Sequence, residues 1–172
     1  STSRRQRQMC IRDRLLYSAL CYEEGHPRRT QHILKVYALA RMLARQAELD
    51  EHQEAVLGAG AILHDIAIKD CKDRGLKATQ AEQQQAAPAL AAEFLEKAGY
   101  PADFLPEVLE LVLHHHEYSR PRGPLMQLLM EADLIVNCYE CPPDPARRQE
   151  IRSVFRTPQG RQLVSLTFLE EK

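Results

Sequence analysis

Apolar side chains recur at intervals of three and four residues along most of the chain, and this spacing constrains the fold more than any other feature. Between residues 29 and 46, for example, Ile33, Val36 and Leu43 fall on one face of a helix. The same spacing predicts helices over about 14–24, 50–63, 88–97, 106–117 and 125–139, and a final segment over about 147–170. Alternating strand patterns and tight hairpin turns are missing from the sequence. We therefore predict an all-α fold.

Local signals mark the ends of several of these helices. Asp50 is a favourable N-cap for the helix after it, and Gly99, just before Pro101, is a favourable stop for the helix before it. Residues 69–80 are polar and contain glycine, so we expect a loop there. Residues 58–61 read Gly-Ala-Gly-Ala, and their small side chains predict the close approach of another helix.

The composition is that of one soluble globular domain, with 172 residues, 44% of them hydrophobic and 27% charged. No apolar run reaches the roughly 20 residues of a membrane helix, and the N-terminus lacks the apolar stretch of a secretory signal. Five cysteines without disulfide-like spacing indicate a reducing compartment, so we expect a cytoplasmic protein. The single C-x-x-C pair, Cys138 and Cys141, has no second pair beside it, and we assign it no function.

The first fourteen residues are rich in arginine, but their sequence is unusual for a protein domain. Residues 4–13, RRQRQMCIRD, read like the translation of a sequencing-adapter DNA. We therefore predict that residues 1–14 are non-native and that the domain spans residues 15–172. Residues 1–14 contain five of the 23 basic residues and one of the 24 acidic residues. The remaining domain is mildly acidic, so we expect no nucleic-acid partner.

Four polar residues interrupt the apolar stripes of the predicted helices. They are His32, the adjacent pair His64-Asp65, and Asp133. A carboxylate buried without a partner is costly, and histidines and carboxylates from separate helices can share a cation. Each residue alone has a simpler explanation, since His32 can be a hydrogen-bonded core residue and Asp133 can cap a neighbouring helix. Together they favour a divalent transition metal such as Mn, Fe, Co, Ni or Zn, with Mg as a further option.

A run of three histidines follows the apolar face of the helix predicted over 106–117. Helical steps from the apolar residues lead to His115 first and to His116 second, whereas His114 falls in line with glutamates on the polar face. We predict that His115 and His116 belong to the site and that His114 is solvated. The alternative is that all three simply end a helix, where cationic residues are favourable.

The order of these residues resembles the H…HD…D pattern of the HD-domain superfamily. The resemblance extends to small bacterial HD proteins with HDIGIK, HHH-x-Y, EAD-x-LVN and FKT-x-x-G motifs. The matching stretches are HDIAIK (64–69), HHHEY (114–118), EADLIVN (131–137) and FRTPQG (155–160), within roughly residues 26–168. This resemblance implies an HD-domain helical bundle with a metal site in its core. It also implies a phosphomonoesterase or phosphodiesterase that cleaves a small phosphorylated substrate such as a nucleotide.

Such a reaction needs a base and cations around the metal. We predict that Asp65 orients or deprotonates the attacking water. Lys69 is the first candidate for stabilising the charge on the phosphoryl group, and Lys35 and Arg120 are candidates for binding the substrate, with Arg122 supported less. The alternative for each lysine is an ordinary solvated position on a helix surface.

One departure from the resemblance concerns the number of metals. No histidine lies between His64 and His114, and Ala86 and Ala87 stand where the similar proteins carry Glu-Gly. We therefore favour one metal over two. The alternatives to an enzyme are a regulatory HD domain with little turnover and a helical interaction module, and a homo-oligomer is compatible with either.

Overall fold

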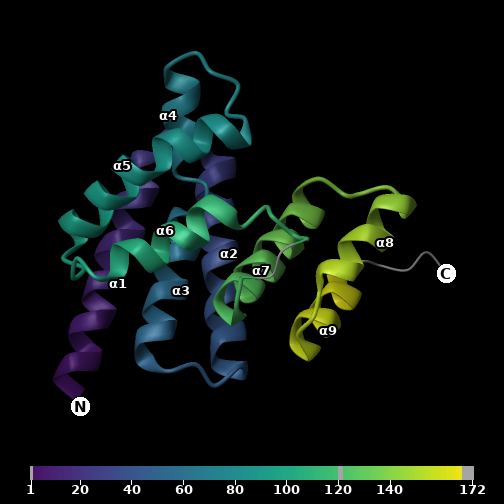
Figure 1. Cartoon of the computed structure of the whole chain (residues 1–172), viewed down its shortest axis with the longest axis horizontal. Helices are drawn as coiled ribbons and strands as arrows, with labels where there is room; N and C mark the ends of the chain where they lie inside the picture. Colours follow the sequence, from purple (N-terminus) through teal and green to yellow (C-terminus); the bar gives the residue numbers. More distant parts are fainter. Residues whose placement is uncertain (1, 120–121, 168–172) are drawn as a thin grey trace.

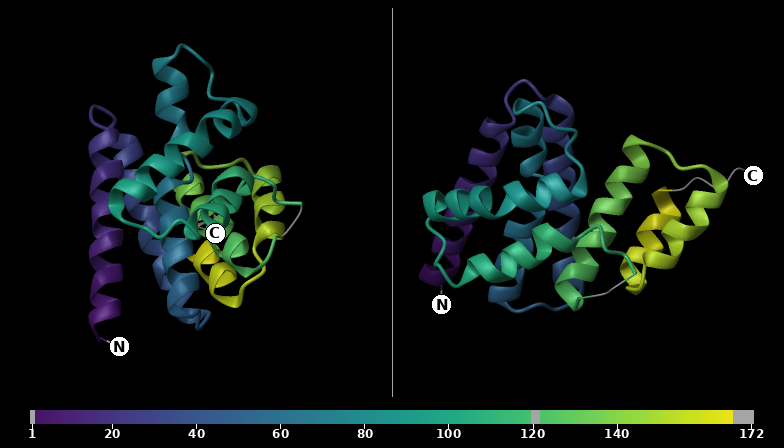
Figure 2. Two further views of the ribbon diagram at one scale, coloured as in Figure 1. Left: turned by 60° about the vertical axis from the view of Figure 1, so that its left-hand side comes forward. Right: turned by 45° about the horizontal axis from the view of Figure 1, so that its top comes forward.

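The computed structural model describes residues 2–119 and 122–167, and within these ranges the chain forms helices and no strands. The helices are α1 (Thr2–Tyr22), α2 (Pro27–Gln46), α3 (Glu51–Leu63), α4 (Ala67–Asp73), α5 (Gln80–Ala98), α6 (Phe104–His114), α7 (Pro124–Glu140), α8 (Pro145–Val154) and α9 (Pro158–Thr167). In Figure 1, α1, α2 and α3 run side by side, and α5 and α6 cross them. Helix α7 packs against α2, and α8 and α9 lie beyond it (Figure 2). The predicted all-α fold is confirmed.

Helix α3 forms the centre of the core. Every residue from Ala55 to Leu63 is buried, because α1, α2, α6 and α7 all contact this helix. The predicted close approach at the small residues is confirmed, since a Cβ added at Gly60 would lie 2.6 Å from Leu111 Cδ1 on α6. Glycine therefore sets the spacing between α3 and α6.

The predicted end signals of α3 and α5 are confirmed. The side chain of Asp50 accepts a hydrogen bond from the backbone N–H of Gln53 (2.8 Å), and the Gln53 side chain accepts one from Asp50 N, which forms a capping box. Gly99 ends α5 in the left-handed conformation, with φ of 90°, and its N–H donates to Leu95 O.

Three predicted boundaries are wrong. Part of the loop expected over 69–80 is helix α4, which ends at Asp73. Helix α5 begins at Gln80 rather than at Pro88, because Thr79 and Glu82 form a second capping box before a polar first turn. The final segment over 147–170 consists of two helices within the described residues, separated by a turn at residues 155–157.

The turn between α8 and α9 is fastened to α7 through one buried carboxylate. Glu131 accepts hydrogen bonds from the backbone N–H groups of Arg156 (2.7 Å) and Thr157 (2.9 Å), and from Gln127 Nε2 (2.8 Å). A Cβ at Gly160 would lie 2.0 Å from Glu131 Oε2. The EAD and FRTPQG stretches therefore meet in space, and this contact holds α9 against α7 next to Asp133.

The N-terminal segment is continuous with the rest of α1. Arg14 Nε donates to the carbonyl of Ala98 (3.0 Å), and Arg12 Cδ would lie 3.3 Å from a Cβ at Gly58. The boundary at residue 15 stays a prediction, since a helix can continue into an added segment.

Candidate metal centre

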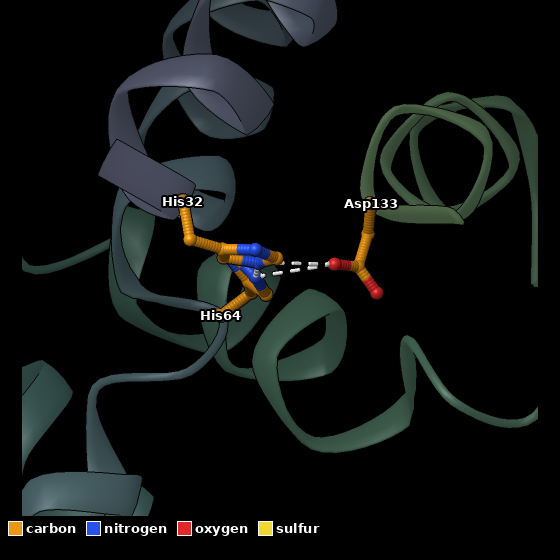
Figure 3. A group of neighbouring side chains, drawn as sticks. All are labelled: His32, His64 and Asp133. Carbon is orange, nitrogen blue, oxygen red and sulfur yellow. Dashed lines mark hydrogen bonds and ion pairs between the residues drawn. The ribbon is translucent and has the colours of Figure 1, made fainter. Parts of the chain in front are cut away.

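Four helices bring the predicted ligands together. His32 lies on the buried face of α2, His64 follows the last residue of α3, and Asp133 lies in the middle of α7. Asp65 comes directly after His64, and His115 follows the end of α6. Figure 3 shows that the imidazoles of His32 and His64 point toward the carboxylate of Asp133.

The ligand atoms are separated by short distances. His32 Nε2 lies 3.0 Å from His64 Nε2 and 3.2 Å from Asp133 Oδ1, and His64 Nε2 lies 3.5 Å from the same oxygen. Asp65 Oδ2 lies 3.5 Å from His64 Nε2 and 3.8 Å from His32 Nε2. Metal–ligand lengths of roughly 2.0–2.2 Å place neighbouring ligand atoms about 3.0–3.6 Å apart, so the atoms of His32, His64 and Asp133 fit around one ion, with Asp65 beside them.

Three imidazoles are oriented in the same way. His64 Nδ1 donates to Ala61 O (2.8 Å), His115 Nδ1 donates to Val112 O (2.9 Å), and His32 Nδ1 donates to Glu140 Oε2 (3.2 Å). Because these oxygens only accept, the Nε2 atom of each neutral ring carries a lone pair. Lone pairs of His32 and His64 then face each other and the Asp133 carboxylate. A cation between them removes this repulsion, as in carboxylate–histidine–metal arrangements.

Charge inside this buried cluster shifts the ionisation of its members. Burial lowers the pKa of His64, but the carboxylates of Asp65 and Asp133 outweigh it and raise this pKa to about 9. Burial raises the pKa of Asp133, but His32 and His64, which face its carboxylate, hold this pKa well below its ordinary value. Without a metal, a proton on His64 thus supplies positive charge beside these carboxylates.

Several buried atoms of the cluster have no hydrogen-bond partner among the described residues. They are both carboxylate oxygens of Asp133, Oδ1 of Asp65 and Nε2 of His115. Asp133 has no exposed surface, so leaving its oxygens unpaired would be costly. Orphaned acceptors of this kind are what a divalent cation satisfies, so the donor set fits a transition metal.

The structure brings His115 and His116 close to the proposed ligands and pairs His114 with a glutamate, while the roles of all three stay predictions. His115 is 3% exposed, and its Nε2 lies 3.6 Å from Asp65 Oδ1. His116 has a ligand atom within 4.8 Å of those of His115 and Asp133. His114, which is half-buried, instead pairs with Glu117 (2.7 Å). Burial and the neighbouring charge of His115 lower the pKa of His116 to about 4.

The space beside His115 and His116 is almost filled. Its volume is about 10 Å³, close to the least that holds one water. Ala87 lines this space and belongs to the main core, and Ala86 packs against that core. Gln80, Gln83 and Gln84 contribute the other α5 side chains there, so no carboxylate of the described part of α5 faces these histidines.

The predicted phosphate-binding cations take other partners. Lys35 Nζ donates to Glu140 Oε1 (2.7 Å) and lies over the Tyr139 ring. Lys69 pairs with Asp73 and lies over the ring of Tyr22. Arg122 pairs with Glu110 and Glu117, and Arg120 lies outside the described residues.

Glu140 is a residue of the site that sequence reasoning missed. Its carboxylate accepts from both His32 Nδ1 and Lys35 Nζ, and it is 11% exposed. Burial raises the pKa of Glu140, but the contacts with Lys35 and His32 hold it below its ordinary value. The sequence pattern that could have identified Glu140 is its position two helical turns after Asp133, on the same face of α7.

A cleft of about 430 Å³ opens on one side of the cluster. His32 and Asp65 line its floor, and Asn137 and Glu140 of α7 form one wall. The cluster is therefore accessible from this side and closed at the other, where the space is almost filled. The volume lies within the range of small-molecule sites, roughly 300–1,000 Å³.

Comparison with known proteins agrees with this geometry. The family model described as HD domain matches residues 29–138, which hold all five of the cluster residues His32, His64, Asp65, His115 and Asp133. No curated protein and no solved structure matches the chain. No helix in the described part of the chain is both long and apolar enough to cross a membrane. The match covers well over half of the sequence, and the chain belongs to the HD-domain family.

Proposed function

We propose that the protein is a metal-dependent phosphohydrolase that cleaves a phosphate ester of a nucleotide or a similar small molecule. The observation that carries this proposal is the buried cluster of histidine nitrogens and orphaned carboxylate oxygens at the floor of an open cleft. Membership of a family that commonly contains hydrolases supports it. We propose His32, His64, Asp65 and Asp133 as ligands of one divalent transition metal, with His115 and His116 beside them.

A bound divalent metal supplies a water of lowered pKa and polarises a phosphoryl oxygen. Asp65 is the proposed base, since its Oδ2 lies among the ligand atoms whereas its Oδ1 has no hydrogen-bond partner. This free oxygen can accept the proton of the attacking water. His115 Nε2 lies 3.6 Å from this oxygen.

The cleft gives the substrate its direction of approach. A phosphoryl group that enters there meets His32 and Asp65 first, while α5 and α6 close the opposite side. Closure on that side keeps bulk water from the carboxylates and strengthens their interactions with a cation.

The test is a panel of phosphate monoesters and diesters, assayed with Mn, Co, Ni or Mg. We expect metal-dependent turnover, and we expect Asp65→Asn to reduce it by about 100-fold or more, since a general base contributes at least that much. The matched control is Asp103→Asn, at an exposed position at the start of α6. Turnover that is independent of metal, or equal in Asp65→Asn and wild type, would contradict the proposal.

A second candidate is a regulatory HD domain that binds metal without turnover. The specific observation that favours it is the absence of a carboxylate from the α5 face that lines the space at His115 and His116. Bound metal with no turnover across the whole panel would support this candidate.

A further inference from the structure

The cleft beside the cluster is lined by cationic side chains that have no role in the proposed function so far. Arg28 and Arg29 of α2 and Lys72 of α4 all line it, together with His26. Arg28 and Arg29 precede His32 by four and three residues, so they lie about one helical turn, roughly 5.4 Å, from it along α2. Lys72 follows the lining residue Ile68 by four residues and shares its face of α4.

One of these cations is fixed in the cleft wall by an ion pair, and another makes no ion pair within the described residues. Arg29 Nε donates to Glu23 Oε2 (2.6 Å), and Glu23 is 1% exposed, so this pair fixes the guanidinium in the cleft wall. Arg29 Nη2 is buried without a hydrogen-bond partner among the described residues. Lys72 is exposed and makes no ion pair within the described ranges.

The start of α2 adds to this positive potential. Gly25, His26 and Pro27 line the cleft, so the N-terminus of this 20-residue helix lies in its wall. His26 makes no side-chain cap on the helix. The positive end of a helix dipole favours an anion, as do the two arginines beside it.

The acidic groups of the cleft are already matched. Glu23 pairs with Arg29, Glu140 pairs with Lys35, and Asp65 belongs to the proposed metal centre. Arg28 lies 3.8 Å from Glu140 and is mostly exposed. With a divalent metal balanced by Asp65 and Asp133, Arg28 and Lys72 leave net positive charge in the cleft.

We infer that the substrate carries a second phosphate group, bound by Arg29 and Lys72 while the scissile phosphoryl group lies beside His32 and Asp65. This inference rests on the proposed function, because it takes the cleft to be the substrate site. The arginine fork binds phosphate oxygens through paired N–H groups, and Lys72 adds a mobile point charge. The preferred substrates are then diphosphates, such as a nucleoside diphosphate, rather than simple monoesters.

The experiment measures binding by calorimetry to the Mn-loaded protein. The probes are the α,β-methylene analogue of adenosine diphosphate, which resists hydrolysis, and inorganic phosphate, which has only one phosphoryl group. We expect Lys72→Gln to weaken binding of the analogue by about five- to tenfold, the effect of one charge-assisted contact. Binding of inorganic phosphate should change less than about twofold. Lys77→Gln, an exposed lysine outside the cleft lining, is the control.

A second variant tests Arg29 without leaving its partner buried and unpaired. Glu23→Gln with Arg29→Gln removes the pair together, and circular dichroism checks that the helices remain. We expect this double variant to weaken binding of the analogue at least as much as Lys72→Gln does. Equal effects of Lys72→Gln on both probes, or none on either, would overturn the inference. If the metal-loaded protein cleaves no ester, the proposed function fails, whereas these binding constants still decide the inference.

Discussion

Glu140 links the proposed metal ligand His32 to the surface lysine Lys35. Its carboxylate accepts from His32 Nδ1 and thereby turns the Nε2 lone pair toward Asp133. We predict that Glu140→Gln weakens metal affinity by about 10- to 100-fold, the usual cost of losing such an outer partner. Competition with a chromogenic chelator measures this affinity.

The control for this substitution is Glu96→Gln, on the outer surface of α5. It should leave the affinity unchanged. Affinity that is equal in Glu140→Gln and wild type would show that the Glu140 contact does not orient His32.

Protonation of His64 predicts how metal binding depends on pH. Nearby carboxylates raise the pKa of His64 from 6.5 to about 9, so at pH 7.5 the metal-free protein holds this ring protonated. A metal ligand must be neutral, so binding at pH 7.5 should release about one proton. Affinity should then rise with pH and level off above about pH 9. Calorimetry in two buffers of different ionisation enthalpy counts the protons, and a count of zero would contradict the assignment of His64.

The sequence predicts the centre of the site better than its surroundings. His32, His64 and Asp133 stand on or beside apolar stripes, so their burial together follows from helix periodicity, and Asp65 follows His64 directly. Helix periodicity does not determine the partner of Lys69, because a long side chain on a helix surface can reach several groups. In the structure this lysine pairs with Asp73. Glu140 was missed because its partners lie over a hundred residues away in the chain.

Among the helices, the contact between α3 and α6 depends on one glycine. A Cβ at Gly60 would lie 2.6 Å from Leu111 Cδ1 and 3.1 Å from Leu111 Cβ, and Leu111 is itself buried. We predict that Gly60→Ala destabilises the fold by about 1–3 kcal/mol through overpacking, despite the higher helix propensity of alanine. Urea unfolding measures this change.

Gly58→Ala is the matched control on the same helix. A Cβ there meets the flexible Arg12 side chain at 3.3 Å and the Tyr37 ring at 3.6 Å, which can adjust. Gly58→Ala should therefore cost less than Gly60→Ala. Equal stability of Gly60→Ala and wild type would show that α3 and α6 are not closely packed at this point.

The helices with clear end signals were predicted most accurately. Asp50 and Gly99 lie next to strong apolar patterns, so both ends were placed correctly. The start of α5 was missed because Pro88 resembles a first-turn proline and the Gln-rich turns before it carry little apolar signal. The helix nevertheless extends back to its capping box at Thr79, since capping and packing against α4 and α6 outweigh the cost of an internal proline.

Across the whole molecule, the proposed ligands come from segments that lie far apart in the sequence. Helices α2, α3, α6 and α7 each contribute or directly precede a cluster residue, so a bound ion would join segments more than 100 residues apart. The α8–α9 turn supports this arrangement through Glu131, two residues before Asp133. A metal that binds the folded state alone would therefore stabilise the packing of all four helices.

The most direct test of the account is the metal content of the purified protein, measured by elemental mass spectrometry for wild type and Asp133→Asn. Asp133 is fully buried, and both of its oxygens lack another partner in the described residues. We predict about one divalent transition-metal ion per wild-type chain, and a loss of most of it in a folded Asp133→Asn variant. A folded wild-type protein that takes up no divalent metal, or equal metal content in both proteins, would contradict the metal centre.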